Sequence, residues 1–181
     1  DTGGRGRRGR EGRAGGWEGG AGAEVIAGGG RRFCGGADMD RLTGALGEGD
    51  VGALYPAKAP AVGDGPDLGD AYPGRFGYFY SCPKPIIAAI NGPCAGIGLI
   101  MSLYADLRFA DAGAKFTTAF AARGLIAEHG VAWLLPRLVG EAGALDLLLT
   151  ARKFDGAEAA RLGLVDAAFP ADALWAHVGD V

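Results

Sequence analysis

Residues 84–105, which read KPIIAAINGPCAGIGLIMSLYA, decide the fold of this chain. No charged residue occurs from Pro85 to Ala105, and about 20 apolar residues are enough to span a bilayer. However, Asn91-Gly92-Pro93 places a turn signal in the middle of the stretch. β-Branched isoleucines precede this turn and good helix formers follow it. We therefore predict a buried strand, a turn and a buried helix, and not a membrane span.

The composition indicates one compact domain. The chain has 181 residues, of which 49% are hydrophobic, so it can bury a sizeable core. Its formal net charge of -3 is too small to favour binding to nucleic acid or to a membrane surface. We therefore expect neither of these partners.

Cysteine and histidine usage favours a cytoplasmic protein without a dedicated metal site. The three cysteines, Cys34, Cys82 and Cys94, have no paired spacing, which is typical of reduced thiols. The only histidines are His129 and His177, and the sequence has no C-x-x-C or H-E-x-x-H spacing. No set of metal ligands is therefore expected.

The first 23 residues differ from the rest of the chain. Glycine and arginine dominate residues 1–23, and Trp17 is their only large apolar side chain. Such a segment cannot bury enough surface to offset the entropy of ordering it, so we expect disorder. Two interpretations stay open: an RNA-binding arm, or a stretch that arose from cloning, truncation or a changed reading frame. The folded core is expected over residues 24–170, followed at 171–181 by the start of a truncated C-terminal helical region.

Strand and helix signals alternate through this core, which predicts an α/β fold. Asp155 is a suitable N-cap for a helix that begins beside it. Strands are expected at 24–27, 84–90, 106–110, 115–118 and 164–166. Helices are expected at 39–46, at about 72–80, after Gly96, at 130–138, at 141–150, after 155 and from 171 onward, with a loop at 47–69.

Two glycine-rich turns are the first candidates for function. One contains Gly35-Gly36-Ala37-Asp38 and the other contains Cys94-Ala95-Gly96-Ile97-Gly98, and each leads from a buried strand into a helix. Small residues let a ligand approach the backbone, and the first turn of a helix offers N–H groups without intrahelical partners. Two such turns facing each other could bind one developing oxyanion. Alternatively, the glycines only permit close packing of strand against helix; neither turn has the pattern of a dinucleotide or phosphate loop.

Together with their surroundings, these turns resemble the crotonase, or enoyl-CoA hydratase/isomerase, superfamily. The resemblance covers about residues 24–170 in the family's order, and it implies the ClpP/crotonase spiral fold of ββα repeats and a homotrimer or dimer of trimers. Family members continue at both ends of this region, so the resemblance also implies a chain truncated at both ends. The matching segments are Phe33-Cys34-Gly35-Gly36-Ala37-Asp38, Lys84 to Gly96, Asp106 to Ala110, Leu135 to Gly140, and Ala157 to Asp166.

The resemblance implies an acyl-CoA thioester as the substrate. Coenzyme A is then part of the substrate, and no separate cofactor is expected. The thioester oxygen would accept hydrogen bonds from the backbone N–H groups of Ala37 and Ile97, with Gly36, Asp38 and Gly96 in the substrate-binding site. Such donors stabilise an enolate and so ease removal of a proton at C2.

The usual hydratase machinery is replaced in this sequence. Family hydratases use two glutamates, and an ungapped alignment from Asn91 puts Ile100 and Phe120 at their positions. Neither side chain can transfer a proton, so hydration is expected to be weak or absent.

One carboxylate, Glu128, is the candidate catalytic base. It lies nine residues before Arg137, where family isomerases often carry their single Asp or Glu. The alternative is a solvated carboxylate beside a helix N-terminus. His129 could be a second acid, but an orienting role or a surface position is expected for it in preference. Phe120 and Trp133 are expected in the acyl pocket, as substrate-binding residues, or in the core.

These residues predict an acyl-CoA-processing enzyme that moves a 3-enoyl double bond to the 2 position in preference to adding water. The alternative is a non-catalytic acyl-CoA-binding remnant of such an enzyme.

Overall fold

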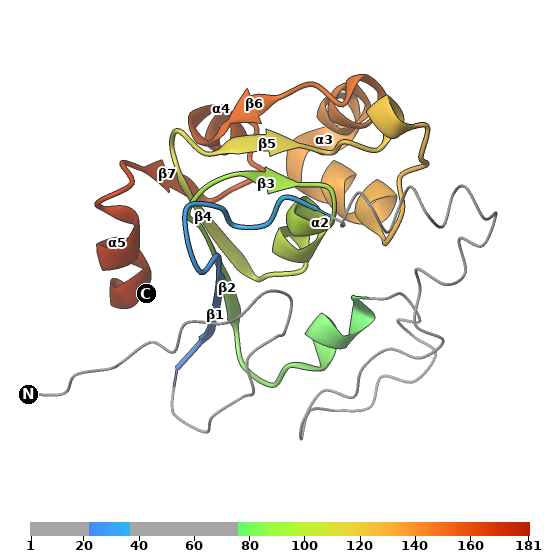
Figure 1. Cartoon of the computed structure of the whole chain (residues 1–181). Coiled ribbons are helices and arrows are strands. Elements are labelled where there is room, and N and C mark those ends of the chain that lie inside the picture. The colour runs from blue at the N-terminus through green and yellow to red at the C-terminus, as the bar shows by residue number, and fades with distance from the viewer. Residues whose placement is uncertain (1–21, 37–75) are drawn as a thin grey trace, which may run out of the picture.

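The computed structural model describes residues 22–36 and 76–181. Several expectations lie outside these described residues, namely those for 1–21, for the helix at 39–46, for the loop at 47–69, and for Ala37 and Asp38. In the described part the chain forms two sheets surrounded by helices (Figure 1), so the predicted α/β class is confirmed.

A four-stranded parallel sheet forms the centre of the fold. Its order is β1-β2-β4-β7, and its strands are Glu24–Ala27, Ile86–Ile90, Leu107–Asp111 and Ala167–Phe169. In this register Val25 pairs with Ile87, which pairs in turn with Leu107. All five residues of β2 are buried, as expected for a parallel strand covered on both faces.

A second sheet and six helical segments complete the described fold. In this sheet β3 (Cys94–Ala95) pairs in parallel with β5 (Lys115–Thr117), and β5 pairs antiparallel with β6 (Phe154–Asp155). The α-helices are α2 (Ile97–Leu103), α3 (Val131–Thr150), α4 (Gly156–Arg161) and α5 (Leu174–Asp180). The 3-10 helices are η3 (Gly77–Ser81) and η4 (Ala121–Arg123).

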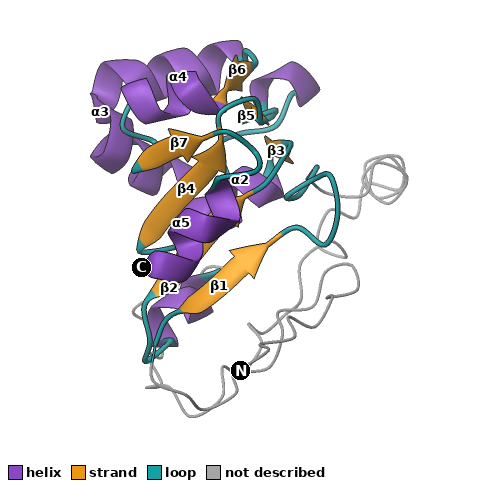
Figure 2. Cartoon of the chain, turned by 90° about the vertical axis from the view of Figure 1, so that its left-hand side faces the viewer, coloured by secondary structure: helices purple, strands orange, loops and turns teal. Residues whose placement is uncertain are grey.

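The two faces of the central sheet contribute to different apolar clusters. On one face, Ile87 and Phe109 pack with Leu174 of α5, and Figure 2 shows α5 in front of the sheet. On the other face, Ile86 and Ile90 join the main core with residues of α2 and α3. Because successive side chains of a strand point to opposite faces, β2 contributes to both clusters.

The charge-free stretch from Pro85 to Ala105 folds into a strand, a turn and a helix, as predicted. Within the described residues, no helix combines the length and the apolar character that crossing a bilayer would need. Two further predictions are confirmed. Non-helical dihedral angles at Gly140 (φ 73°, ψ 166°) divide α3 into the two expected helices, and the Asp155 side chain caps α4 by accepting the N–H of Glu158 at 2.9 Å.

The strand expected at 164–166 is wrong, because the strand here is β7, at 167–169. Leu164 and Val165 lie in a bend and are buried in the main core. A short apolar run does not distinguish a strand from a buried turn. The helix expected at about 72–80 corresponds, in the described part, to the 3-10 helix at 77–81.

Aspartates hold the starts of two central strands. Asp106 accepts the N–H of Ile86, and Asp166 accepts the N–H of Arg108, both at 2.7 Å. The Arg108 guanidinium is buried and donates to the carbonyl oxygens of Leu164 (3.0 Å) and Ala105. Its burial lowers the pKa of Arg108, an effect that Asp166 and Asp106 oppose. The hydrogen bonds of Asp106, Asp166 and Arg108 therefore hold the starts of β2 and β4 in place.

The side-chain amide of Asn91 fastens the loop after β1 to the turn after β2. Its Oδ1 accepts the N–H of Gly28 at 3.0 Å, and its Nδ2 donates to the carbonyl oxygens of Gly28 at 3.1 Å and Gly30 at 2.8 Å. The two segments are in close contact, because a side chain at Gly92 would collide with the carbonyl of Arg31. The approach to the first glycine-rich turn is fixed in this way.

Replacing Asn91 should therefore destabilise the folded protein. We expect Asn91→Ala to lower the free energy of unfolding by about 1–3 kcal/mol, because polar groups of the loop lose their partner. Urea denaturation measures the change, and Lys153→Ala, at an exposed position, is the control that should shift stability by less than about 0.5 kcal/mol. Equal stability of the two variants would show that the Asn91 bonds do not hold the loop.

Candidate active site

The two glycine-rich turns lie against each other. Cys34 forms a parallel bridge with Cys94, and the carbonyl oxygen of Cys34 accepts the N–H of Ala95 at 2.9 Å. A Cβ added to Gly36 (φ 103°) would lie 3.2 Å from the carbonyl oxygen of Ala95, and one added to Gly96 (φ 51°) would lie 3.9 Å from the Cα of Gly36. The structure thus brings together Gly36 and Gly96, two of the predicted site residues.

Helix α2 packs on the first turn without room for a side chain. A Cβ added to Gly98 would lie 2.6 Å from the Cβ of Cys34 and would also collide with the Cys34 carbonyl oxygen. Close packing is therefore one role of these glycines. It does not exclude the other role, because the helix still presents its first backbone N–H groups at the junction of the two turns.

Ile97 is the predicted oxyanion donor of the second glycine-rich turn, and this role stays a prediction. It is the first residue of α2, and the first hydrogen bond of this helix runs from the N–H of Ile100 to the carbonyl of Gly96 at 3.0 Å. The N–H of Ile97 therefore has no acceptor within the helix. Ala37 and Asp38, the other predicted residues of this site, lie just beyond the described residue 36 and stay predictions.

Ile100 and Phe120, the residues predicted to stand at the two glutamate positions of hydratases, are part of the core. Ile100 is 0% exposed and Phe120 is 6% exposed, and both belong to the main apolar cluster. Phe120 immediately precedes η4, whose residues lead toward α3. Both side chains contribute packing and shape here, and neither offers a group that could transfer a proton.

Glu128 lies in the turn between η4 and α3. Its side chain is 25% exposed, and its Oε2 lies 3.5 Å from Nε2 of His129, whose side chain is only 8% exposed. The carbonyl oxygen of Glu128 accepts the N–H of Val131, the first residue of α3, at 3.1 Å. The carboxylate is therefore reachable from solvent and lies beside an imidazole. The surface position considered for His129 is wrong, because its ring is largely buried.

An aromatic cluster connects this turn with α2. The Phe76 ring meets the His129 imidazole edge to face at 5.5 Å between centroids. It also packs on Tyr104, the residue that directly follows α2, with 6.2 Å between the ring centroids. Phe76 and Phe79 are both buried in the main core.

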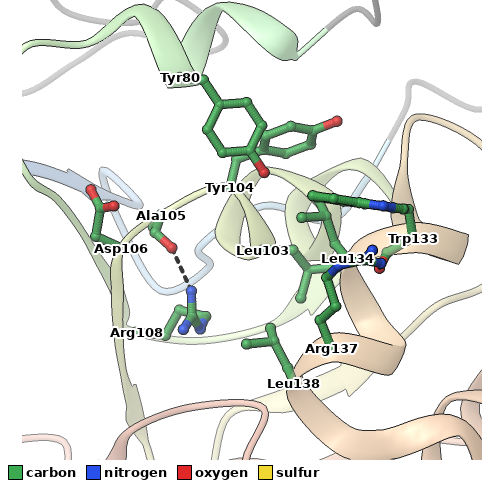
Figure 3. Close-up of a pocket in the computed structure, with 10 residues that line it drawn as sticks. All are labelled: Tyr80, Leu103, Tyr104, Ala105, Asp106, Arg108, Trp133, Leu134, Arg137 and Leu138. Carbon is green, nitrogen blue, oxygen red and sulfur yellow. Dashed lines mark hydrogen bonds between the residues drawn. The ribbon is translucent and has the colours of Figure 1, made fainter. Parts of the chain in front are cut away.

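Trp133 lies at the surface of α3. It is 50% exposed, and the Arg137 guanidinium stacks 3.7 Å above its ring. Both residues line a hollow of about 320 Å³ at the carboxyl end of α2 (Figure 3). The other lining residues are Tyr80, Leu103, Tyr104, Ala105, Asp106, Arg108, Leu134 and Leu138. The structure thus places Trp133 at the end of α2 opposite to the glycine-rich turns, and its role in binding substrate stays a prediction.

The cysteines beside the turns are not equivalent. Cys94 is fully buried beneath α2, and burial raises the pKa of its thiol far above the usual value. It is therefore protonated near neutral pH and does not act as a nucleophile.

Among the described residues, no group of three or more His, Cys, Asp and Glu side chains is arranged to hold a metal ion.

Tyr104 is the residue of this region that the sequence reasoning missed. Its hydroxyl donates to the carbonyl oxygen of His129 at 3.0 Å and so links the end of α2 to the turn that carries Glu128. The available signal was a polar aromatic residue at the end of an otherwise apolar helix, which usually has a hydrogen-bond partner when buried.

Comparisons with known proteins agree with this architecture. The family model described as enoyl-CoA hydratase/isomerase matches residues 70–179. A "Probable enoyl-CoA hydratase" of Rhodobacter capsulatus is 39% identical over 148 residues, which are 82% of this chain and 52% of the relative. The 1,2-epoxyphenylacetyl-CoA isomerase of Escherichia coli is 32% identical over 145 residues, 78% of this chain and 50% of the relative.

A solved structure gives the same result. The enoyl-CoA hydratase/isomerase from Pseudoalteromonas atlantica superposes with a TM-score of 0.65 at 30% identity. The match covers 86% of this chain and 54% of the other. The chain spans about half the length of the curated relatives it matches.

The close contact at Gly98 can be tested by adding one methyl group. We expect Gly98→Ala to destabilise the protein by about 1–3 kcal/mol, because the methyl would force Cys34 and α2 apart. Thermal denaturation measures this change. Gly179→Ala is the matched control, since nothing lies within 4 Å of its added Cβ, and it should be neutral or slightly stabilising. If the two variants were equally stable, the turns would not be as closely packed as described.

Proposed function

This chain belongs to the enoyl-CoA hydratase/isomerase family, and we propose that it acts on an enoyl-CoA thioester by moving a proton along the acyl chain. The observation that carries the proposal is the direct contact of the two glycine-rich turns at the first residue of α2. That contact supports a site in which two backbone N–H groups converge on one oxygen. The substrate supplies the coenzyme A, and the proposal involves no other cofactor.

The reaction begins with polarisation of the thioester. Its carbonyl oxygen accepts the N–H of Ile97 and, as the second donor, that of Ala37. A donor of this kind contributes about 3–4 kcal/mol to the transition state. The negative charge that develops when C2 loses a proton therefore collects on an oxygen that is already hydrogen-bonded. Gly36, Asp38 and Gly96 line the same site in this proposal.

Glu128 serves as the base. Its carboxylate removes a proton from C2 of a 3-enoyl-CoA, and the electron pair moves onto the thioester oxygen to give a dienolate. Return of the proton to C4 moves the double bond from C3–C4 to C2–C3 and restores the carboxylate. The partial exposure of Glu128 and its position beside His129 support this role.

Isomerisation is favoured over hydration by the residues at two positions. Water addition needs a group that activates the water, and the two family positions for such groups hold the buried side chains Ile100 and Phe120. The same observation favours a second candidate function, a non-catalytic acyl-CoA-binding protein. In that case Glu128 would be a surface carboxylate without a chemical role.

The test is proton exchange in deuterated water. The protein is incubated with a 3-enoyl-CoA, and deuterium at C2 and the conjugated product are both followed by NMR. We expect Glu128→Gln to lower both rates by about 10²–10⁴-fold, because the amide cannot take the proton. Glu141→Gln, at an exposed position of α3, is the matched control and should behave like the unaltered protein.

Three other results would change the conclusion. Rates that survive Glu128→Gln would remove Glu128 from the mechanism. Thioester binding without exchange would favour the non-catalytic function. Rapid hydration of crotonyl-CoA that is insensitive to Glu128→Gln would contradict the assignment as an isomerase.

A further inference from the structure

We propose that Tyr104 is a positioning residue. It holds the turn Glu128-His129-Gly130 so that the Glu128 carboxylate stays in the position from which it acts as the base. This inference rests on the proposed function, in which Glu128 is the base. It adds a residue that does not touch the reacting atoms and acts through the turn.

The hydroxyl of Tyr104 fastens the backbone of this turn. It donates to the carbonyl oxygen of His129 at 3.0 Å. The approach requires glycine at the next position, because a Cβ on Gly130 (φ 84°) would lie 2.5 Å from the Tyr104 oxygen. The turn is itself unusual, since His129 also has a positive φ of 55°. A non-glycine residue in that conformation needs support from its surroundings, and the Tyr104 hydroxyl provides it.

The ring of Tyr104 is held from several sides. Its centroid lies 5.3 Å from that of Tyr80, 5.8 Å from that of Phe79 and 6.2 Å from that of Phe76. Figure 3 shows the two tyrosine rings next to each other. Burial also raises the pKa of the Tyr104 hydroxyl, which keeps it protonated and able to donate. The donor therefore has little freedom to move.

The position of Tyr104 ties the base to the oxyanion donor. Tyr104 directly follows α2, and Ile97 begins the same helix. At about 1.5 Å per residue, a helix of this length sets their Cα atoms roughly 10 Å apart along its axis. One short, rigid element thus determines where the thioester oxygen and the turn with Glu128 lie relative to each other. The His129 ring, which lies 3.5 Å from the carboxylate, completes the connection within the turn.

The test is Tyr104→Phe, which removes only the hydroxyl and leaves the ring in the aromatic cluster. We expect kcat for 3-enoyl-CoA isomerisation to fall by about ten-fold or more, with KM changed less than about two-fold, because a displaced base loses rate and not substrate affinity. In the Glu128→Gln background the same change should have no further effect. Thr150→Ala, which removes an exposed hydroxyl at the end of α3, is the control.

A second measurement does not depend on activity. The N–H of Val131 donates to the carbonyl oxygen of Glu128, so its hydrogen exchange reports on the turn. Exchange at Val131 should be faster in Tyr104→Phe and unchanged in Thr150→Ala. Gly130→Ala approaches the contact from the other side by displacing the hydroxyl, and it should reproduce both effects if Tyr104→Phe proves unstable.

The outcomes separate this inference from the proposed function. Absence of C2 exchange in the unaltered protein would overturn the role of Glu128 as base. The proposed effect of Tyr104 on catalysis would then fall with it. Unaltered kcat in Tyr104→Phe, a fall that persists in the Glu128→Gln background, or unchanged exchange at Val131 would each overturn the positioning role alone.

Discussion

The contact between the loop after β1 and the turn after β2 is the constraint on which the rest of the site depends. Asn91 satisfies three polar groups of that loop, and Gly92 leaves no space between the segments. The next residues along each segment are Cys34 and Cys94, which pair as neighbouring strands do. These contacts bring the two turns together, because small residues leave no side chain between Gly36 and Gly96.

The candidate site combines a buried apolar interior with a partly exposed carboxylate. Ile100, within α2, and Phe120, just before η4, both belong to the main core. The remaining carboxylate, Glu128, lies on a turn between two helical segments and is held by contacts from its neighbours. The interior thus holds helix α2, and the candidate base Glu128 lies at the edge of that interior.

Local patterns predicted much of this fold. The turn signal after Ile90 and the N-cap at Asp155 each act within a few residues, so the sequence nearby was sufficient. The error at 164–166 has a physical cause as well. Leu164 and Val165 are apolar because they fill the core from a bend, and burial requires the same residue types in a bend as in a strand.

The sequence by itself determined the α/β class and the family, and it located the two glycine-rich turns. Only the tertiary structure decided that the two turns touch, that His129 lies buried beside Glu128, and that the hydroxyl of Tyr104 reaches the carbonyl of His129. The reason is separation along the chain. Cys34 and Cys94 are 60 positions apart in the sequence, and Tyr104 and His129 are 25 positions apart, so no local pattern records either contact.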